Sequence, residues 1–422
     1  MDENTKPQTA VEKKEESGKT YRETVFQITE RYLLHHYDIR YNEVSNDAQY
    51  KLKEETDYYE LNSDALYIEL QNFRVNISQA KLISLLKSGM MENHNPFKNY
   101  FDRVSKSEQA NQQDYILKLA GYVKTHNQER FGRHFKKMLV RSVACSLNNH
   151  IVNKQAFILV HNKQNSGKTT FLNWLCPAEL KSYLTENIGT DKDSLIALCE
   201  NFIINLDELA TFSKMEINSF KSMLSKAHVK VRRPFEKKAV VTPRRANFVG
   251  STNKTEFLND ESGSVRWLCF EIDSIDWNYS KEIDIDLVWA QAYDLYKNKF
   301  PYELTAAEIE ENEQENKKHQ RLTLEMDLIQ RYYYPGTKTD SDAFYTASDF
   351  MKYLPEKLGA SLKTSVENIG KGLKSLGFEQ SHKFNGVYTI KGYYIKFNSQ
   401  NELTHLLNES KQVDIKELIP SE

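Results

Sequence analysis

The chain has 422 residues, enough for two or three domains, with 39% hydrophobic and 27% charged residues. Its formal net charge of −2 neither requires nor excludes a nucleic-acid partner, because local basic patches matter more than the sum. No apolar run reaches the length of a membrane span and the N-terminus carries no apolar signal region, so we expect a cytoplasmic protein without a membrane partner. The four cysteines are far apart and form no Cys-x-x-Cys pair, which predicts buried reduced thiols.

In chain order, shifts in composition and hydrophobic periodicity divide the sequence into successive segments. Apolar runs alternate with helical stretches in the middle, which is typical of an α/β core, and short helices followed by a hairpin signal at Asn385-Gly386 indicate a winged-helix-like α+β domain near the end. The predicted segments are 1–19, a disordered tail; 20–150, a mainly helical N-terminal domain; 151–275, the α/β core; 276–333, a helical extension; 334–343, a linker; 344–400, the winged-helix-like domain; and 401–422, a C-terminal tail.

The core opens with a predicted phosphate-binding loop. The apolar run Ala156–Val160 predicts a buried strand, and a helix stopped by Pro177 follows Gly167-Lys168-Thr169. In such a P-loop, backbone N–H groups hold the phosphates, the lysine reaches the β/γ oxygens and the Thr hydroxyl ligates Mg²⁺. Asn162 replaces the first glycine of the pattern, and Asn tolerates positive φ best after Gly. The expected cofactors are ATP and Mg²⁺, and the expected nucleotide-binding residues are Asn165, Ser166, Gly167, Lys168, Thr169 and Thr170.

Two further predicted strands end in polar residues suited to the same chemistry. Asp207 and Glu208 follow the apolar strand Phe202–Leu206. We expect Asp207 to hold Mg²⁺ with Thr169, and Glu208 to orient and deprotonate the attacking water. The alternative is a helix-capping pair on a solvated turn, which the preceding apolar strand disfavours. The next strand leads to Asn253, whose amide is expected to contact the γ-phosphate or the lytic water.

Arg266 stands between a loop and the last predicted strand of the core, Trp267–Ile272. We expect it to act as an arginine finger in the active site of a neighbouring subunit, a role worth 10³–10⁵ in rate in the systems measured. A surface salt bridge is the alternative.

Basic residues gather between the second and third predicted strands of the core. Short β-like flanks predict a hairpin with Phe235–Lys238 at its tip, and basic side chains there suit a nucleic-acid backbone. A solvated basic loop is the alternative. In the C-terminal domain, the helix Ser365–Leu376 has basic residues on its outward face and is compatible with either DNA or protein recognition. The expected DNA contacts are Arg233, Lys237, Lys238, Lys371 and Lys374.

Taken together, the P-loop, the strand ending in Asp207-Glu208, the run Pro243–Asn253 and the run Phe257–Trp267 resemble the virulence-associated protein E family. These are P-loop ATPases of phages and mobile elements, related to superfamily 3 helicases with an AAA+-like core. The resemblance covers about residues 95–330. It implies Lys168 and Thr169 as Walker A, Asp207 and Glu208 as Walker B, Asn253 as sensor 1 and Arg266 as the finger. It also implies a pore-facing hairpin near Phe235–Lys238.

From the motifs and the resemblance we expect an ATP-dependent DNA helicase or replication-initiator ATPase of a mobile element or prophage. It would act as a ring, expected to be a hexamer, on single-stranded or forked DNA, and a separate primase is a conceivable partner. A non-translocating NTPase switch in phage defence or regulation is one alternative. A DNA-binding scaffold with a degenerate ATPase is the other, and the intact Lys168, Asp207, Glu208 and Asn253 speak against it.

Overall fold

The computed structural model describes residues 13–14, 20–109, 112–189, 191–212, 214–233, 238–258, 265–358, 364–384 and 386–398. The described residues fall into two units: those within Met1–Asn253 and Arg266–Ala306, and those within Lys254–Val265 and Ala307–Glu422. The predicted C-terminal tail and most of the predicted disordered tail lie outside the described residues. Of the predicted disordered tail, the structure describes β1 (Lys13–Lys14), which pairs with β2 (Thr20–Tyr21) just after that tail.

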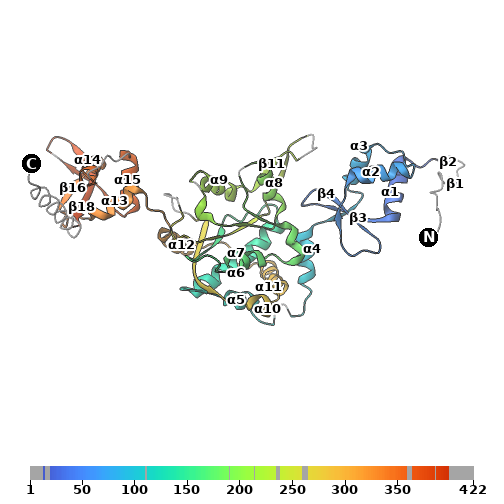
Figure 1. Ribbon diagram of the computed structural model, residues 1–422, viewed down its shortest axis with the longest axis horizontal. Coiled ribbons are helices and arrows are strands. Elements are labelled where there is room, and N and C mark those ends of the chain that lie inside the picture. The colour runs from blue at the N-terminus through green and yellow to red at the C-terminus, as the bar shows by residue number, and fades with distance from the viewer. Residues whose placement is uncertain are drawn as a thin grey trace, which may run out of the picture. The chain divides into compact units, whose positions relative to one another are not determined.

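A six-stranded sheet forms the centre of the first unit (Figure 1). All neighbouring strands run parallel except at one edge, where β7 lies antiparallel to β14. The predicted α/β core is thereby confirmed as a fold class. In spatial order the strands are β7 (Val123–Thr125), β14 (Trp267–Ile275), β8 (Ala156–Val160), β13 (Asn247–Thr252), β10 (Ile203–Leu206) and β9 (Leu184–Glu186).

The central strands are apolar without alternation because both faces of the sheet are buried. Every residue of β8 and β10 is buried, as expected for parallel strands that carry helices on both sides. Aromatic packing joins the sheet to its helices: Phe157 stacks on Phe270 at 4.7 Å between ring centroids, and Phe131 meets Phe270 edge-on at 5.3 Å. The helices of this unit's core are α4 (Pro96–Val104), α5 (Tyr115–Ala120), α6 (Gln128–Leu147), α7 (Lys168–Trp174), α8 (Lys192–Glu200), α9 (Lys214–Ser225), α10 (Tyr279–Glu282) and α11 (Ile285–Lys297).

The predicted N-terminal domain requires a correction at both ends. Helices α4, α5 and α6 share one hydrophobic core with the central sheet, so they belong to it rather than to a separate domain. The remaining N-terminal segment has its own core and, beside its helices, a four-stranded sheet that sequence periodicity missed. It missed this sheet because most residues of β4 are only half-buried and give no apolar alternation. The elements are α1 (Val25–His36), α2 (Ser63–Asn72), α3 (Gln79–Leu86), β3 (Tyr37–Asn42), β4 (Asp47–Leu52), β5 (Tyr59–Glu60) and β6 (Glu92–His94).

The second unit contains an antiparallel sheet packed against helices. The predicted hairpin is confirmed, with Gln380 opposite Tyr393 and Phe384 opposite Thr389. The predicted linker is corrected: Tyr334 pairs with Lys396 and Pro335 with Ile395, so the start of that segment is a strand of this sheet. The elements are α12 (Ala306–Lys318), α13 (Leu324–Tyr332), β15 (Tyr333–Pro335), β16 (Ala343–Tyr345), α14 (Ala347–Leu358), α15 (Val366–Ser375), β17 (Gln380–Phe384) and β18 (Thr389–Phe397).

Two whole-chain expectations can be compared with this fold. All four cysteines are buried and unpaired, which confirms the prediction of reduced thiols. Within the described part of the chain, no helix has both the length and the apolar character needed to cross a bilayer.

Candidate functional site

The loop between β8 and α7 contains two residues with positive φ. Gly167 caps α7 with φ of 85° and Asn165 has φ of 55°, both in the left-handed region that Gly and Asn tolerate best. Asn162, at the position of the first glycine of the pattern, does not have positive φ. The unusual conformations lie three and five residues further on, directly before the helix.

Lys168 is almost completely buried, at 5% exposure, and its ammonium group is surrounded by oxygen atoms. The Nζ atom donates hydrogen bonds of 2.8 Å to Asn253 Oδ1 and to Ser166 Oγ, and a longer one of 3.2 Å to the carbonyl of Lys163. Burial lowers the pKa of Lys168, while the negative charge of Asp207 acts in the opposite direction. The structure therefore brings the predicted lysine and the predicted sensor asparagine into direct contact.

Three oxygen-bearing side chains from three elements converge beside Lys168. Thr169 Oγ1 donates to Asp207 Oδ1 at 2.9 Å and lies 3.2 Å from Ser251 Oγ, which also donates to Asp207 Oδ1. Mg²⁺ favours one or two carboxylates supplemented by water and substrate phosphates, and this donor set fits that requirement. Groups of three or more His, Cys, Asp or Glu that could hold a metal by themselves are absent from the described residues.

The acidic turn after β10 is fixed by its backbone. The Asp207 N–H donates to Asn187 Oδ1 at 2.9 Å, and the Glu208 N–H donates to Asp207 Oδ1 at 3.0 Å. Glu208 has φ of 51°, a conformation that costs energy for a residue other than Gly and tends to occur at functional sites. Glu208 is exposed, so its side chain is within reach of solvent.

Two residues of this arrangement had no predicted role. Ser251 ends in the same cluster because β13 lies between β8 and β10, and its position at the strand tip was the available sequence signal. Asn187 follows β9 and supports Asp207 through a side-chain acceptor. Nothing in the local sequence marks Asn187, since its role depends on the parallel pairing of β9 with β10.

Arg266 lies at the amino edge of the sheet, where the parallel strands begin, whereas Lys168 lies at the carboxyl edge, where they end. Trp267, the residue after it, is paired with Ala156 at the start of β8, and the Arg266 carbonyl accepts from the Ala156 N–H at 2.8 Å. The Arg266 side chain donates through Nε to Ser225 Oγ at 3.1 Å. The structure thus does not bring Arg266 to the loop between β8 and α7 of its own chain.

The predicted basic hairpin exists as β11 (His228–Val231) paired with β12 (Val240–Pro243). Lys237 lies outside the described residues, and Lys238 is exposed. Arg233 is instead engaged within the protein, since it forms an ion pair with Glu200 and donates to the Ser45 carbonyl at 2.6 Å.

Arg244, a further basic residue of this segment, is buried, whereas the two predicted lysines of the C-terminal domain are exposed. Arg244 is 1% exposed and donates to the carbonyls of Ala246 and Asn153, so its role is structural. On α15 of the second unit, Lys371 and Lys374 are both exposed, and Lys371 pairs with Glu367 at 2.9 Å.

Comparison with known proteins places this architecture in a family. A family model described as the virulence-associated protein E-like domain matches residues 104–321, slightly more than half of the chain. No curated protein matches the sequence. Two solved structures of the NrS-1 C-terminal region in its apo form are similar, at 11% and 12% identity with TM-scores of 0.44 and 0.45. Each alignment covers 88% of this chain, and 99% or 100% of the other.

Proposed function

The chain belongs to the family of the virulence-associated protein E-like domain, and on this premise we propose that it is an ATP-driven DNA helicase or replication-initiator ATPase of a mobile element or prophage. One observation carries the proposal. At the carboxyl ends of three parallel strands, β8, β10 and β13, two sets of side chains are already in hydrogen-bond contact: Lys168 with Asn253, and Thr169 with Asp207 and Ser251. A cation, a metal-binding pair and a polar amide at one sheet edge are the groups that nucleotide hydrolysis needs.

In the proposed mechanism, Lys168 exchanges its internal oxygen partners for the β- and γ-phosphate oxygens of ATP. Thr169 and Asp207 would hold Mg²⁺, which when bound with the nucleotide neutralises phosphate charge. The Glu208 carboxylate takes a proton from water while the water oxygen bonds to the γ-phosphorus and the bond to ADP breaks. Asn253 orients the water or the γ-phosphate through its amide.

The position of Arg266 supports self-association. A guanidinium at the amino edge of the sheet is remote from its own P-loop, whereas in a ring the same edge can face the nucleotide of the next chain. We propose a hexameric ring that moves single-stranded DNA with its basic hairpins. Lys238 remains a proposed DNA contact, together with Lys237, Lys371 and Lys374. Arg233, which is paired with Glu200, is not retained in this proposal.

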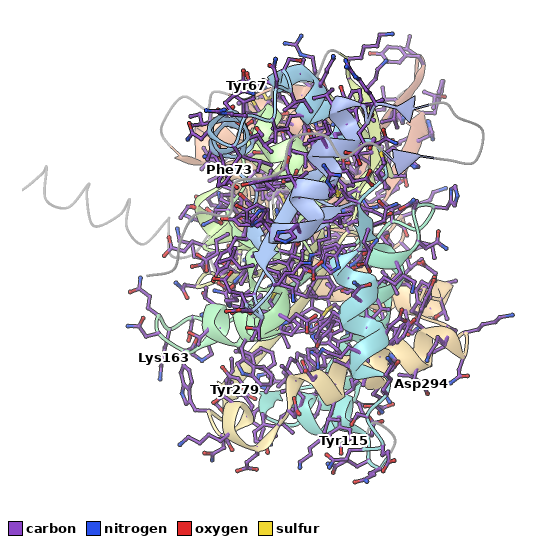
Figure 2. The ribbon with its side chains drawn as sticks, turned by 90° about the vertical axis from the view of Figure 1, so that its right-hand side faces the viewer. Tyr67, Phe73, Tyr115, Lys163, Tyr279 and Asp294 are labelled. Atoms are coloured by element: carbon purple, nitrogen blue, oxygen red, sulfur yellow. The ribbon has the colours of Figure 1, made fainter. Side chains whose placement is uncertain are left out.

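The test measures ATP hydrolysis with and without single-stranded DNA, together with strand displacement on a forked duplex. Lys168→Ala should abolish turnover, because a buried cation that contacts the phosphates is lost. Lys163→Ala is the matched control, since this lysine of the same loop is exposed (labelled in Figure 2) and contributes its backbone carbonyl. Hydrolysis that DNA leaves unchanged, without strand displacement, would overturn the helicase function and favour a non-translocating switch.

A further inference from the structure

An exposed tryptophan lies against the P-loop. A Cβ atom built on Gly167 would come within 2.8 Å of Trp277 Cζ2 and 2.9 Å of Cη2, so the six-membered ring of the indole lies directly on this glycine. Yet 54% of Trp277 is exposed. Of the other tryptophans, Trp267 and Trp289 are fully buried and Trp174 is half-buried. Trp277 therefore exposes a large aromatic ring to solvent directly beside the proposed phosphate-binding loop.

The backbone around Trp277 is fixed at both sides. Before it, the Asp276 N–H donates to the Tyr122 carbonyl at 2.8 Å. After it, the Ser280 hydroxyl donates to the Trp277 carbonyl at 3.1 Å, and the Asn278 N–H donates to the Asp276 carboxylate at 3.0 Å. The ring is therefore presented by an ordered turn between β14 and α10.

The same turn is anchored to α7, the helix that directly follows the P-loop. Tyr279 in α10 is 1% exposed and packs edge-on against Phe171 and Trp174 of α7, at 5.1 Å and 4.9 Å between ring centroids. Figure 2 labels Tyr279 and Lys163, which lie in the same lower part of that view. In addition, β14 pairs directly with β8, the strand that leads into the loop. Trp277 thus keeps a fixed position relative to Gly167.

We propose that Trp277 is the base platform of the nucleotide site, on which the purine ring of the bound nucleoside triphosphate stacks. This inference rests on the proposed function and concerns the base, the part of the ligand that the P-loop does not bind. In this proposal Gly167, Lys168 and Thr169 hold the phosphates, so the base needs a different contact. The exposed indole face of Trp277 is an aromatic surface beside these residues. Stacking of this kind tolerates any base with a π face, so Trp277 contributes affinity more than it distinguishes adenine from guanine.

The experiment compares ATP with inorganic tripolyphosphate, which has the phosphates but no base, on the full-length chain with Mg²⁺. Wild-type protein should bind ATP more tightly than tripolyphosphate. Trp277→Ala should weaken ATP binding on the order of tenfold, as expected for the loss of one base–aromatic stack, and leave tripolyphosphate binding unchanged. Trp277→Phe should recover most of the ATP affinity. Tyr59→Ala, which truncates a similarly exposed aromatic at 53%, is the control and should change neither affinity.

Intrinsic fluorescence gives a second readout. Because the remaining tryptophans are buried or half-buried, ATP but not tripolyphosphate should change the emission of wild-type protein, and Trp277→Phe should remove that change. Equal effects of Trp277→Ala on both ligands, or no effect on either, would overturn the inference. A variant that loses affinity for a single-stranded oligonucleotide while ATP binding is intact would assign Trp277 to DNA instead. If wild-type protein binds neither phosphate ligand, the proposed function itself fails.

Discussion

At the scale of single residues, the buried Lys168 determines how the site responds to pH. Burial lowers its pKa in the free protein, so this lysine loses its proton at a lower pH than an exposed one. The oxygen atoms around Nζ, from Asn253, Ser166 and the loop backbone, compensate for part of the lost hydration. Bound phosphates would add full negative charge at the same place and favour the protonated form.

This gives a signed prediction for nucleotide affinity. The ATP complex holds the Lys168 proton more tightly than the free protein does, because the phosphates raise the pKa of Lys168. Affinity should therefore be greatest where free Lys168 is charged, and should fall as the pH rises through its lowered pKa. Equilibrium titration with Mg²⁺-ATP at a series of increasing pH values measures the effect. Lys168→Arg, whose guanidinium stays charged, should give a flat profile, and an equally flat wild-type profile would contradict the prediction.

At the scale of elements, the site depends on how closely β10 and β13 approach. Leu206 is paired with Gly250, and a Cβ atom on Gly250 would come within 2.7 Å of the Leu206 carbonyl oxygen and 3.0 Å of the Leu209 and Ile158 side chains. These two strands carry Asp207 and Ser251 at their ends. The missing side chain at Gly250 therefore sets the spacing of the Asp207 and Ser251 side chains.

Gly250→Ala should lower both stability and nucleotide binding. Forcing a methyl group into this packed position is expected to cost about 1–3 kcal/mol of unfolding free energy, because neither the carbonyl nor the neighbouring strand can move freely. Thermal unfolding and ATP titration measure the two effects. Gly189→Ala is the control, since its added Cβ would meet only Ser194 Oγ at an ordinary 3.5 Å. A Gly250→Ala protein with unchanged melting temperature would show that the strands can separate without penalty.

At the scale of the whole molecule, the two edges of the central sheet carry different parts of the proposed active site. The carboxyl edge holds Lys168 and its partners, and the amino edge holds Arg266, whose side chain contacts Ser225 at the end of α9. A single chain cannot bring these edges together. If both are needed for turnover, the active site is complete only between neighbouring chains.

Mixing two inactive variants tests this arrangement. Lys168→Ala and Arg266→Ala should each lose most ATPase activity alone, whereas their mixture should regain part of it. In the mixture, a chain with intact Lys168 can receive Arg266 from a neighbour that carries Lys168→Ala. Mixing either variant with the double variant should restore nothing. Full activity of Arg266→Ala alone, or an inactive mixture that native mass spectrometry shows to be co-assembled, would exclude the shared site.

The sequence by itself determined the α/β core, its main strands and the residues at the strand tips, because buried parallel strands are continuous apolar runs and the loop with Gly167-Lys168-Thr169 has a local signature. It also determined the hairpins at β11–β12 and β17–β18. It did not reveal the half-buried N-terminal sheet, the membership of α4 to α6 in the central core, or the strand at Tyr333. Only the tertiary structure decided that Ser251 and Asn187 support Asp207, that Arg233 is paired internally, and that Trp277 lies on Gly167. Those contacts join residues far apart in the chain, and sheet order and side-chain packing, rather than any local pattern, bring them together.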